Sequence, residues 1–171
     1  MERSNVFGGT KKIIEDNIVV YHGSSVEVVN PIIKIRKQFK DFGFGFYVTN
    51  LEKQAVKWAV RNLNFGGNAV ISKFYFSLKG DFNVKVFREI DDEWLDFIAK
   101  CRSGVGHDYD IVEGPMADDQ VFNFAQMYLR GDIKKSTFLD YCRFKRPTHQ
   151  ICFCTERSLE CLKFMKSYEV R

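Results

Sequence analysis

Asp41-Phe42-Gly43-Phe44-Gly45-Phe46-Tyr47-Val48-Thr49 is the stretch on which the fold depends. Two glycines alternate with aromatic residues and lead directly into a run of β-forming residues. Because glycine allows backbone angles and close approaches that other residues resist, the stretch predicts a tight loop that opens into a buried strand. A backbone of this shape suits a bound ligand.

A helix is expected directly after this loop, over residues 51–63. Small and aliphatic side chains would face inward and cations outward. The inward residues are Ala55, Val56, Ala59, Val60 and Leu63, and the outward residues are Lys53, Lys57 and Arg61. Trp58 falls on neither face, so it is either a stacking platform for a ligand or a ring that packs on a neighbouring strand.

The length of 171 residues predicts one domain that buries about two-thirds of the surface its unfolded chain exposes. We expect a flexible lead-in over residues 1–17 and a single domain over 18–171. The net charge of +4 permits an anionic ligand, but the cations are scattered among acids rather than gathered in a nucleic-acid-binding stripe. No apolar run approaches the ~20 residues that cross a bilayer, so we expect no membrane contact and a cytoplasmic location.

The five cysteines form no regular framework and are expected to be reduced. Cys152 and Cys154 stand on a predicted strand, and we expect them to point to opposite faces and to share no metal ion. The chain has three histidines and neither a His-Glu-x-x-His nor a Cys-x-x-Cys pair. We therefore expect no metal site.

Hydrophobic periodicity and breakers predict the remaining elements. Strands are expected at 18–21, 69–78, 83–87, 109–115 and 149–155, with 69–78 as the central one. Helices are expected at 91–101, after Asp118 and Asp119, after Ser136 or Thr137, and at 156–165 at the end of the chain.

Three polar and aromatic groups of residues each stand at the edge of a predicted strand: Tyr21-His22-Gly23-Ser24, Gly45-Phe46-Tyr47-Val48-Thr49 and His149-Gln150-Ile151-Cys152-Phe153. With the Gly-Pro-x-Ala-Asp-Asp motif at 114–119, their order resembles the ADP-ribosyltransferase superfamily, in the branch of diphtheria toxin and the poly(ADP-ribose) polymerases. The chain is more closely similar to a bacterial group within that superfamily. The resemblance covers residues 18–165, and it implies an α+β domain of two packed or split antiparallel sheets flanked by helices.

The resemblance also implies a binding site for NAD as co-substrate. His22 would hydrogen-bond the adenosine ribose, and the backbone of Gly23 would hold the nicotinamide carboxamide. Tyr47 would wall the nicotinamide pocket, and Trp58, eleven positions later, would stack on the nicotinamide ring. The implied cofactor-binding residues are His22, Gly23, Ser24, Gly45, Tyr47, Thr49 and Trp58, and the implied catalytic residues are His22, Tyr47 and Gln150.

Gln150 departs from this pattern, because active transferases commonly carry a glutamate there that holds a ribose hydroxyl and steadies developing positive charge. A neutral amide can accept the hydroxyl's hydrogen bond but supplies no negative charge. The loss of such a partner costs on the order of 10²–10³ in rate. Glu113, Asp118 and Asp119 are candidates to supply the missing charge, whereas His149 is expected to face away from Gln150.

The function implied is mono-ADP-ribosyl transfer from NAD to a protein or nucleic-acid acceptor, by a bacterial toxin or regulatory enzyme that has an antitoxin or another regulator as partner. Two alternatives stay open: a module that binds NAD or ADP-ribose with little or no catalysis, and an NAD glycohydrolase. The basic segment 26–40, which includes Lys34 and Lys40, is either a surface loop or a partner for a pyrophosphate.

Overall fold

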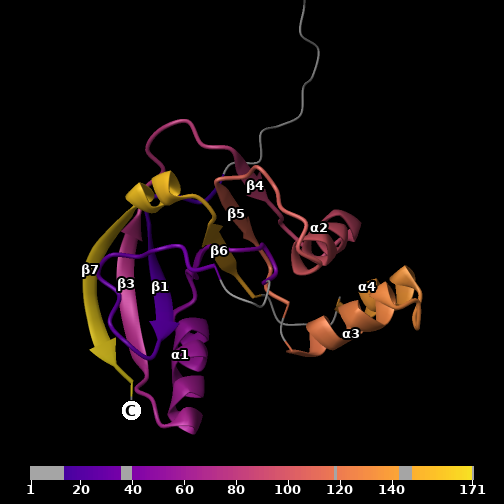
Figure 1. The fold of residues 1–171 in the computed structure, drawn as a ribbon, viewed down its shortest axis with the longest axis horizontal. Coiled ribbons are helices and arrows are strands. Elements are labelled where there is room, and N and C mark those ends of the chain that lie inside the picture. The colour runs from indigo at the N-terminus through magenta and orange to yellow at the C-terminus, as the bar shows by residue number, and fades with distance from the viewer. Residues whose placement is uncertain (1–13, 36–39, 118, 143–147, 171) are drawn as a thin grey trace, which may run out of the picture.

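The structure is a computed structural model that describes residues 14–35, 40–117, 119–142 and 148–170. Strands and helices are interspersed along the chain (Figure 1). The strands are β1 (Ile18–Ser24), β2 (Phe46–Val48), β3 (Val70–Phe76), β4 (Val84–Val86), β5 (Ile111–Gly114), β6 (Gln150–Phe153) and β7 (Leu162–Glu169). The helices are α1 (Glu52–Val60), α2 (Asp92–Arg102), α3 (Asp119–Leu129) and α4 (Lys135–Cys142), with 3₁₀ helices at Arg61–Phe65 and Glu156–Cys161.

Within the described residues these strands form two sheets, in the orders β1-β3-β7 and β2-β6-β5-β4. The prediction of an α+β domain with two sheets flanked by helices is confirmed. The prediction that both sheets are antiparallel throughout is wrong for one pair, since β4 and β5 run parallel. The reason is that α2 lies between them in the chain, and such a helical crossover returns the chain to the end of the sheet from which it left.

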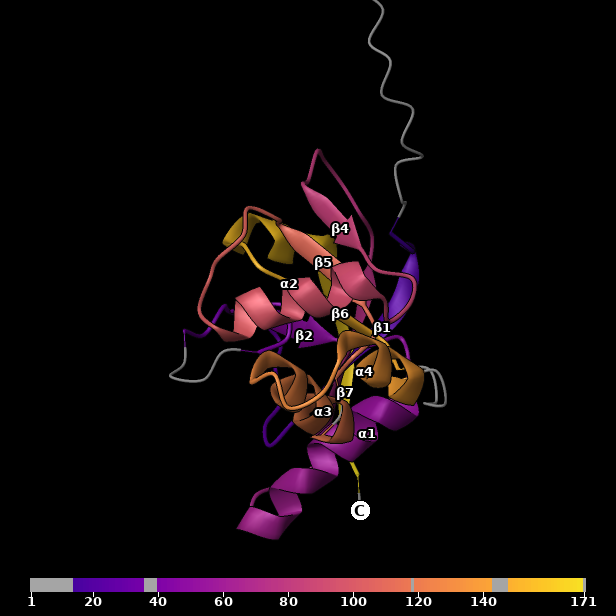
Figure 2. The same cartoon turned by 90° about the vertical axis from the view of Figure 1, so that its right-hand side faces the viewer.

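The three-stranded sheet separates two apolar layers, because successive side chains of a strand point to opposite faces. Val20 and Phe74 face the core between the two sheets, together with Phe76. Ile71 points the other way and packs with Ala55 of α1. Figures 1 and 2 show α1 beside β1 in both views.

The four-stranded sheet is covered in the same way. Phe46 and Ile151 face the core between the sheets. Tyr47 and Cys152, which pair across β2 and β6, face a second core built with α2, α3 and α4. Figure 2 shows these three helices on one side of the sheet. Neighbouring residues along β2 therefore pack into different hydrophobic cores.

The two sheets meet at a single bridge between Tyr21 and Thr49. The Tyr21 N–H donates to the Thr49 carbonyl at 2.8 Å, and the Thr49 N–H donates to the Tyr21 carbonyl at 3.0 Å. Thr49 is fully buried there, and its hydroxyl accepts the Leu51 N–H at 3.0 Å. This bridge brings the end of β1 beside the end of β2.

The helix after the glycine-rich loop is shorter than predicted. Ala55 and Ala59 are fully buried as expected, but Val60 and Leu63 are 37% and 44% exposed. The α-helix ends at Val60, and the tighter 3₁₀ turn that follows rotates Leu63 away from the face that Ala55 and Ala59 share.

The predicted closing helix over residues 156–165 is wrong. A 3₁₀ helix at Glu156–Cys161 is followed by β7, which pairs antiparallel with β3. Leu159, Leu162 and Met165 are spaced as in a helix, yet Leu162 and Phe164 also alternate inward as in a strand, and Met165 is 48% exposed. Without β7, the N–H and C=O groups along one side of β3 would form an open sheet edge. Pairing satisfies these groups, which favours a strand over a helix for this segment.

Other local predictions are confirmed. β1 begins at Ile18, and β3 is the central strand of its sheet. The helix expected at 91–101 is α2, and the structure shows in addition that Asp91 caps it by accepting the Trp94 N–H at 2.8 Å. Packed structure nevertheless starts before Ile18, because Ile14 is 3% exposed and belongs to the core between the sheets. Residues 1–13 of the expected lead-in lie outside the described residues.

Candidate functional site

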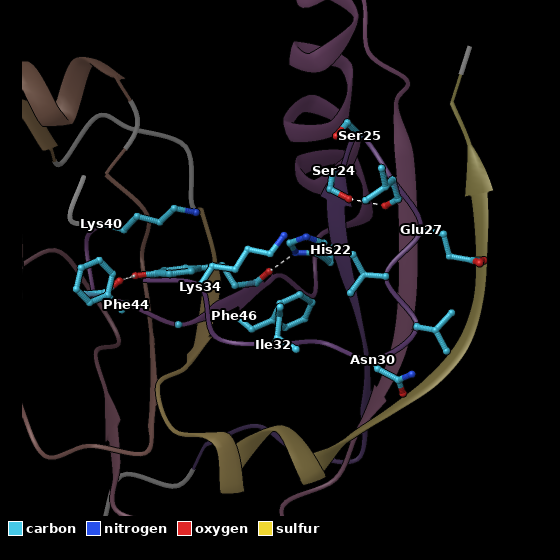
Figure 3. A pocket seen from close by; sticks show the side chains of 16 residues that line it. His22, Ser24, Ser25, Glu27, Asn30, Ile32, Lys34, Lys40, Phe44 and Phe46 are labelled. Atoms are coloured by element: carbon cyan, nitrogen blue, oxygen red, sulfur yellow. Dashed lines mark hydrogen bonds between the residues drawn. The ribbon is translucent and has the colours of Figure 1, made fainter. Parts of the chain in front are cut away.

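A cavity of about 530 Å³ lies where the end of β1 meets the glycine-rich loop. We call it the first cavity (Figure 3). Its volume is within the range of small-molecule sites. The structure brings four of the sequence-predicted residues to its wall, along with two lysines. These residues are His22, Ser24, Gly45, Tyr47, Lys34 and Lys40.

His22 is held on two sides. Its ring stacks on Phe46 with centroids 4.4 Å apart, and its Nδ1 lies 2.7 Å from the carbonyl oxygen of Tyr47. Because a carbonyl can only accept, Nδ1 carries the hydrogen and Nε2 is an acceptor in the neutral ring. His22 can therefore accept a hydrogen bond from a hydroxyl group of a ligand.

Gly23 presents its backbone at the edge of β1. Tyr21 turns its N–H and C=O toward Thr49, away from β3. In an antiparallel ladder, residues two apart direct these groups to the same side, so Gly23 directs its own N–H and C=O beyond the end of β2. A Cβ on Gly23 would lie 2.1 Å from the carbonyl oxygen of Ala55, which explains why glycine stands where α1 crosses β1.

Tyr47 is fixed by the loop that precedes it. Its hydroxyl donates to the Gly43 carbonyl at 2.7 Å and accepts the Phe42 N–H at 3.1 Å. Burial, reinforced by Cys152, raises the pKa of the Tyr47 phenol well above its usual value, so the group stays neutral. The Lys40 ammonium lies 4.7 Å from the centre of the Tyr47 ring, which is a cation–π contact.

Gln150 is 3% exposed and shares its face of the sheet with Tyr47, since both belong with Cys152 on the helix-covered side. Its Nε2 donates to Asp41 Oδ2 at 3.0 Å and to the Pro115 carbonyl at 3.2 Å. Both partners are acceptors, which determines the orientation of the amide. The group that Gln150 can offer to a ligand is thus its side-chain carbonyl, as a hydrogen-bond acceptor.

Asp41 is the site residue that the sequence analysis missed. This carboxylate is 5% exposed, touches Gln150, and accepts the Ala117 N–H at 2.9 Å. Arg102 of α2 forms an ion pair with it and compensates its charge. Its position as the first residue of the Asp41–Thr49 stretch is the only sequence signal that singled it out.

The structure does not bring Glu113 to Gln150. Glu113 pairs with Ile151 on β6, and Gln150 pairs with the next residue, Gly114, so their side chains are on opposite faces. Glu113 Oε1 instead lies 3.0 Å from Nε2 of His149, which faces away from Gln150 as predicted. Asp118 and the side chain of Asp119 lie outside the described residues.

Trp58 is half-buried and does not line the first cavity as the described residues form it. One turn before it, Gln54 is buried, and its amide donates to the His149 carbonyl and accepts the His149 N–H at 3.2 Å. Residues four apart share a flank of a helix. Trp58 therefore lies on the flank of α1 that Gln54 ties to the start of β6.

Basic groups dominate the polar wall of the first cavity. Figure 3 shows the side chains of Lys34 and Lys40 extending between Phe44 and His22. The carboxylate of Glu27 accepts a hydrogen bond from Ser167 of β7, so it is engaged at the far rim. The wall therefore favours an anionic ligand.

Within the described part of the chain, no helix is long and apolar enough to cross a bilayer, and no cluster of three acidic, histidine or cysteine side chains is arranged to hold a metal ion. None of the five cysteines, all of which lie in the described part of the chain, forms a disulfide.

Comparison with protein families matches residues 18–164 to the family described as Protein of unknown function (DUF3990). The match begins at the first residue of β1 and ends within β7, so it includes both sheets and every residue of the first cavity. No curated protein and no solved structure matches the chain.

Proposed function

The chain belongs to the DUF3990 family, and we propose that it is an NAD-dependent mono-ADP-ribosyltransferase with the ADP-ribosyltransferase fold. The observation that carries the proposal is the way the stretch 41–49 links the three candidate catalytic residues. Its Tyr47 carbonyl holds His22, and its Asp41 carboxylate holds Gln150. His22 and Tyr47 line a cavity of suitable size and charge, and Gln150, which does not line it, is tied to the same stretch through Asp41.

The first cavity supports binding of the ADP half of NAD. His22 Nε2 can accept a ribose hydroxyl, and the ammonium groups of Lys34 and Lys40 complement the negative pyrophosphate. Because both lysines are exposed, each contributes a modest amount that salt reduces.

The edge of β1 supports binding of the nicotinamide half. A carboxamide has one acceptor oxygen and an NH₂ donor, which match the N–H and C=O that Gly23 directs to the same side. The ring of Tyr47 already holds the Lys40 ammonium over its face at 4.7 Å. The oxidised nicotinamide ring is also a cation, so it can replace that ammonium on the same aromatic surface.

Gln150 predicts slow transfer. Its carbonyl can orient a ribose hydroxyl, but Asp41, the carboxylate that contacts it among the described residues, is compensated by Arg102. Within the described part of the chain no uncompensated carboxylate then faces developing positive charge, which costs on the order of 10²–10³ in rate. In the last step the acceptor, a protein or a nucleic acid, attacks. A partner that blocks this attack would act as the regulator of the enzyme.

This same feature favours a second candidate, a module that binds NAD or ADP-ribose without transfer. Gln150 is engaged by Asp41 and Pro115, and Asp41 is engaged by Arg102. A site built only for binding needs no catalytic carboxylate. Hydrolysis of NAD differs from transfer only in using water as the acceptor.

Calorimetric titration with NAD tests binding. We expect His22→Ala to weaken NAD binding about tenfold, which is the worth of one good hydrogen bond. His107→Gln is the control, since His107 lies outside the first cavity and glutamine keeps a donor for its carbonyl partner. Absence of binding by folded wild-type protein, or equal affinity in both variants, would overturn the proposed site.

Nicotinamide release separates the two candidates. Gln150→Glu alone puts a carboxylate against Asp41, so the informative variant is the exchange Asp41→Asn with Gln150→Glu, in which the new amide donates to the new carboxylate. For a transferase we expect release about 10²-fold faster than in wild type. Tight NAD binding without release in either protein identifies the binding module.

A further inference from the structure

A second cavity, of about 470 Å³, lies on the other side of the glycine-rich loop and has no role in the proposed function. Its wall contains Cys101, His107, Tyr109 and Cys154, and it shares Gly43 and Phe44 with the first cavity. Cys154 is only partly buried, so its thiol is reachable from this cavity.

Cys152 and Cys154 lie side by side, contrary to the expectation that they point to opposite faces. Side chains two residues apart in a strand share a face, and Cys154 follows directly on β6. The two Sγ atoms are 3.4 Å apart. Cys152 is fully buried and also contacts the hydroxyl of Tyr47, whereas Cys154 borders the cavity.

His107 is arranged to donate a hydrogen bond to Cys154. Its Nδ1 accepts the Tyr109 N–H at 3.1 Å, so Nε2 carries the hydrogen in the neutral ring. Nε2 donates this hydrogen to the Phe42 carbonyl at 3.0 Å, and the Cys154 thiol donates to the same oxygen at 4.0 Å. The ring also hydrogen-bonds Cys154 itself, so the neutral ring shares its one hydrogen between the Phe42 carbonyl and the sulfur.

These neighbours give Cys101, Cys152 and Cys154 different pKa values. The hydrogen bond from Cys152 lowers the pKa of Cys154 to about 6, with His107 adding to it against the opposing effects of burial and Asp110. Burial raises the pKa of Cys101 to about 12 and that of Cys152 well above its usual value. At neutral pH the thiolate is therefore carried by the cysteine that borders the cavity.

We propose that Cys154 is a nucleophilic thiolate that reacts with hydrogen peroxide entering the second cavity, and that Cys152 resolves the product as a disulfide. The Cys154 sulfur forms a bond to one peroxide oxygen, the O–O bond breaks, and the leaving hydroxide takes a proton from solvent to form water. The Cys152 thiol then attacks the sulfenic sulfur of Cys154. The S–S bond forms, the S–O bond breaks, and the leaving hydroxide departs as water with the Cys152 proton, so two thiols are oxidised and one peroxide is reduced.

The test is mass spectrometry of the reduced full-length protein after treatment with one equivalent of hydrogen peroxide. We expect a loss of two hydrogens that maps to a Cys152–Cys154 disulfide. Cys152→Ser should instead accumulate a sulfenic acid on Cys154 that dimedone traps. Cys154→Ser should consume peroxide at least tenfold more slowly, and Cys161→Ser, which removes a buried cysteine elsewhere, should behave as wild type. Equal peroxide consumption with and without Cys154 overturns the proposal.

The pH dependence of alkylation by iodoacetamide tests the role of His107 as a positioning residue. The groups that face Cys154 are Cys152, His107, Asp110 and Cys101. We expect a half-maximal rate at Cys154 near pH 6. His107→Leu should move this midpoint upward, toward the ordinary thiol value of about 8.5, and His107→Gln should restore much of the shift. A wild-type midpoint above pH 8 overturns the thiolate assignment.

Discussion

The two cavities share the loop residues Gly43 and Phe44 but offer different chemistry. The first is bordered by a histidine acceptor, a sheet edge and lysine ammonium groups, which suit an anionic ligand rich in hydroxyls. The second is bordered by thiols and an imidazole donor, which suit an electrophile. The comparison teaches that one short loop can border two sites of opposite character, because the elements on its two sides supply different side chains.

The largest expected effect comes from the carboxylate at the start of this loop. Asp41→Ala leaves Arg102, Gln150 and the Ala117 N–H without their partner, and breaking a buried ion pair costs about 3–5 kcal/mol. We expect this loss in the free energy of unfolding, measured with urea. We also expect NAD binding at the first cavity and the reactivity of Cys154 at the second cavity to weaken together.

The matched control is Asp132→Ala, which removes an exposed aspartate and should change stability by less than about 0.5 kcal/mol. A loss below about 1 kcal/mol in the Asp41 variant would show that the loop does not depend on this carboxylate. The two cavities would then have to be treated as independent.

A smaller effect should separate the cavities. Lys34→Gln removes a charge from the first cavity alone, and we expect NAD binding to weaken about fivefold, roughly 1 kcal/mol, at low salt. Lys166→Gln, on β7, makes the same change in net charge at an exposed position outside both cavities. Calorimetry at two salt concentrations measures the NAD affinity of both variants. An equal loss in the two variants would mean that only net charge matters.

The smallest effect concerns Asp110, which accepts a hydrogen bond from Thr155 in the wall of the second cavity. Burial alone raises the pKa of Asp110, but hydrogen bonds from Arg157, the Asn83 N–H and Thr155 lower it by more. A carboxylate whose folded pKa is lowered stabilises the protein above its unfolded pKa near 4, and this contribution is lost as pH falls through the folded pKa.

Arg157→Gln should therefore make stability less sensitive to acid below about pH 4. Because the Arg157 side chain is 58% exposed, we expect only a small loss of stability at neutral pH. Urea unfolding at pH 5 and pH 3 measures the difference, with Arg130→Gln as an exposed control. Unchanged acid sensitivity in the Arg157 variant would show that Arg157 does not lower the pKa of Asp110.

Elements defined by neighbours in sequence were predictable. Asp91 caps α2 three residues before Trp94, and β3 is a continuous β-forming run, so both depend on contacts that the chain makes with itself locally. β7 was not predictable in this way. Its residues fit a helix as well as a strand, and only the open edge of β3 decided between them.

The candidate site likewise contains contacts that the sequence predicted and contacts that it did not. The family resemblance implied that His22 and Tyr47 share a site, and they meet through a hydrogen bond at the bridge between the sheets. The contact between Asp41 and Gln150 joins residues 109 positions apart, and no local pattern encodes it. Trp58 shows the converse, since its position off the helix stripe was visible but its distance from the first cavity was not.

The sequence by itself determined the glycine-rich loop before β2, the strand β3 and the inward face shared by Ala55 and Ala59, because periodicity and backbone preference act over a few residues. Only the tertiary structure decided which charges and thiols become neighbours. It pairs Asp41 with Arg102 and Gln150, and it sets Cys154 beside His107. Packing determines such contacts because the distance between side chains from different elements depends on how the whole chain folds back on itself.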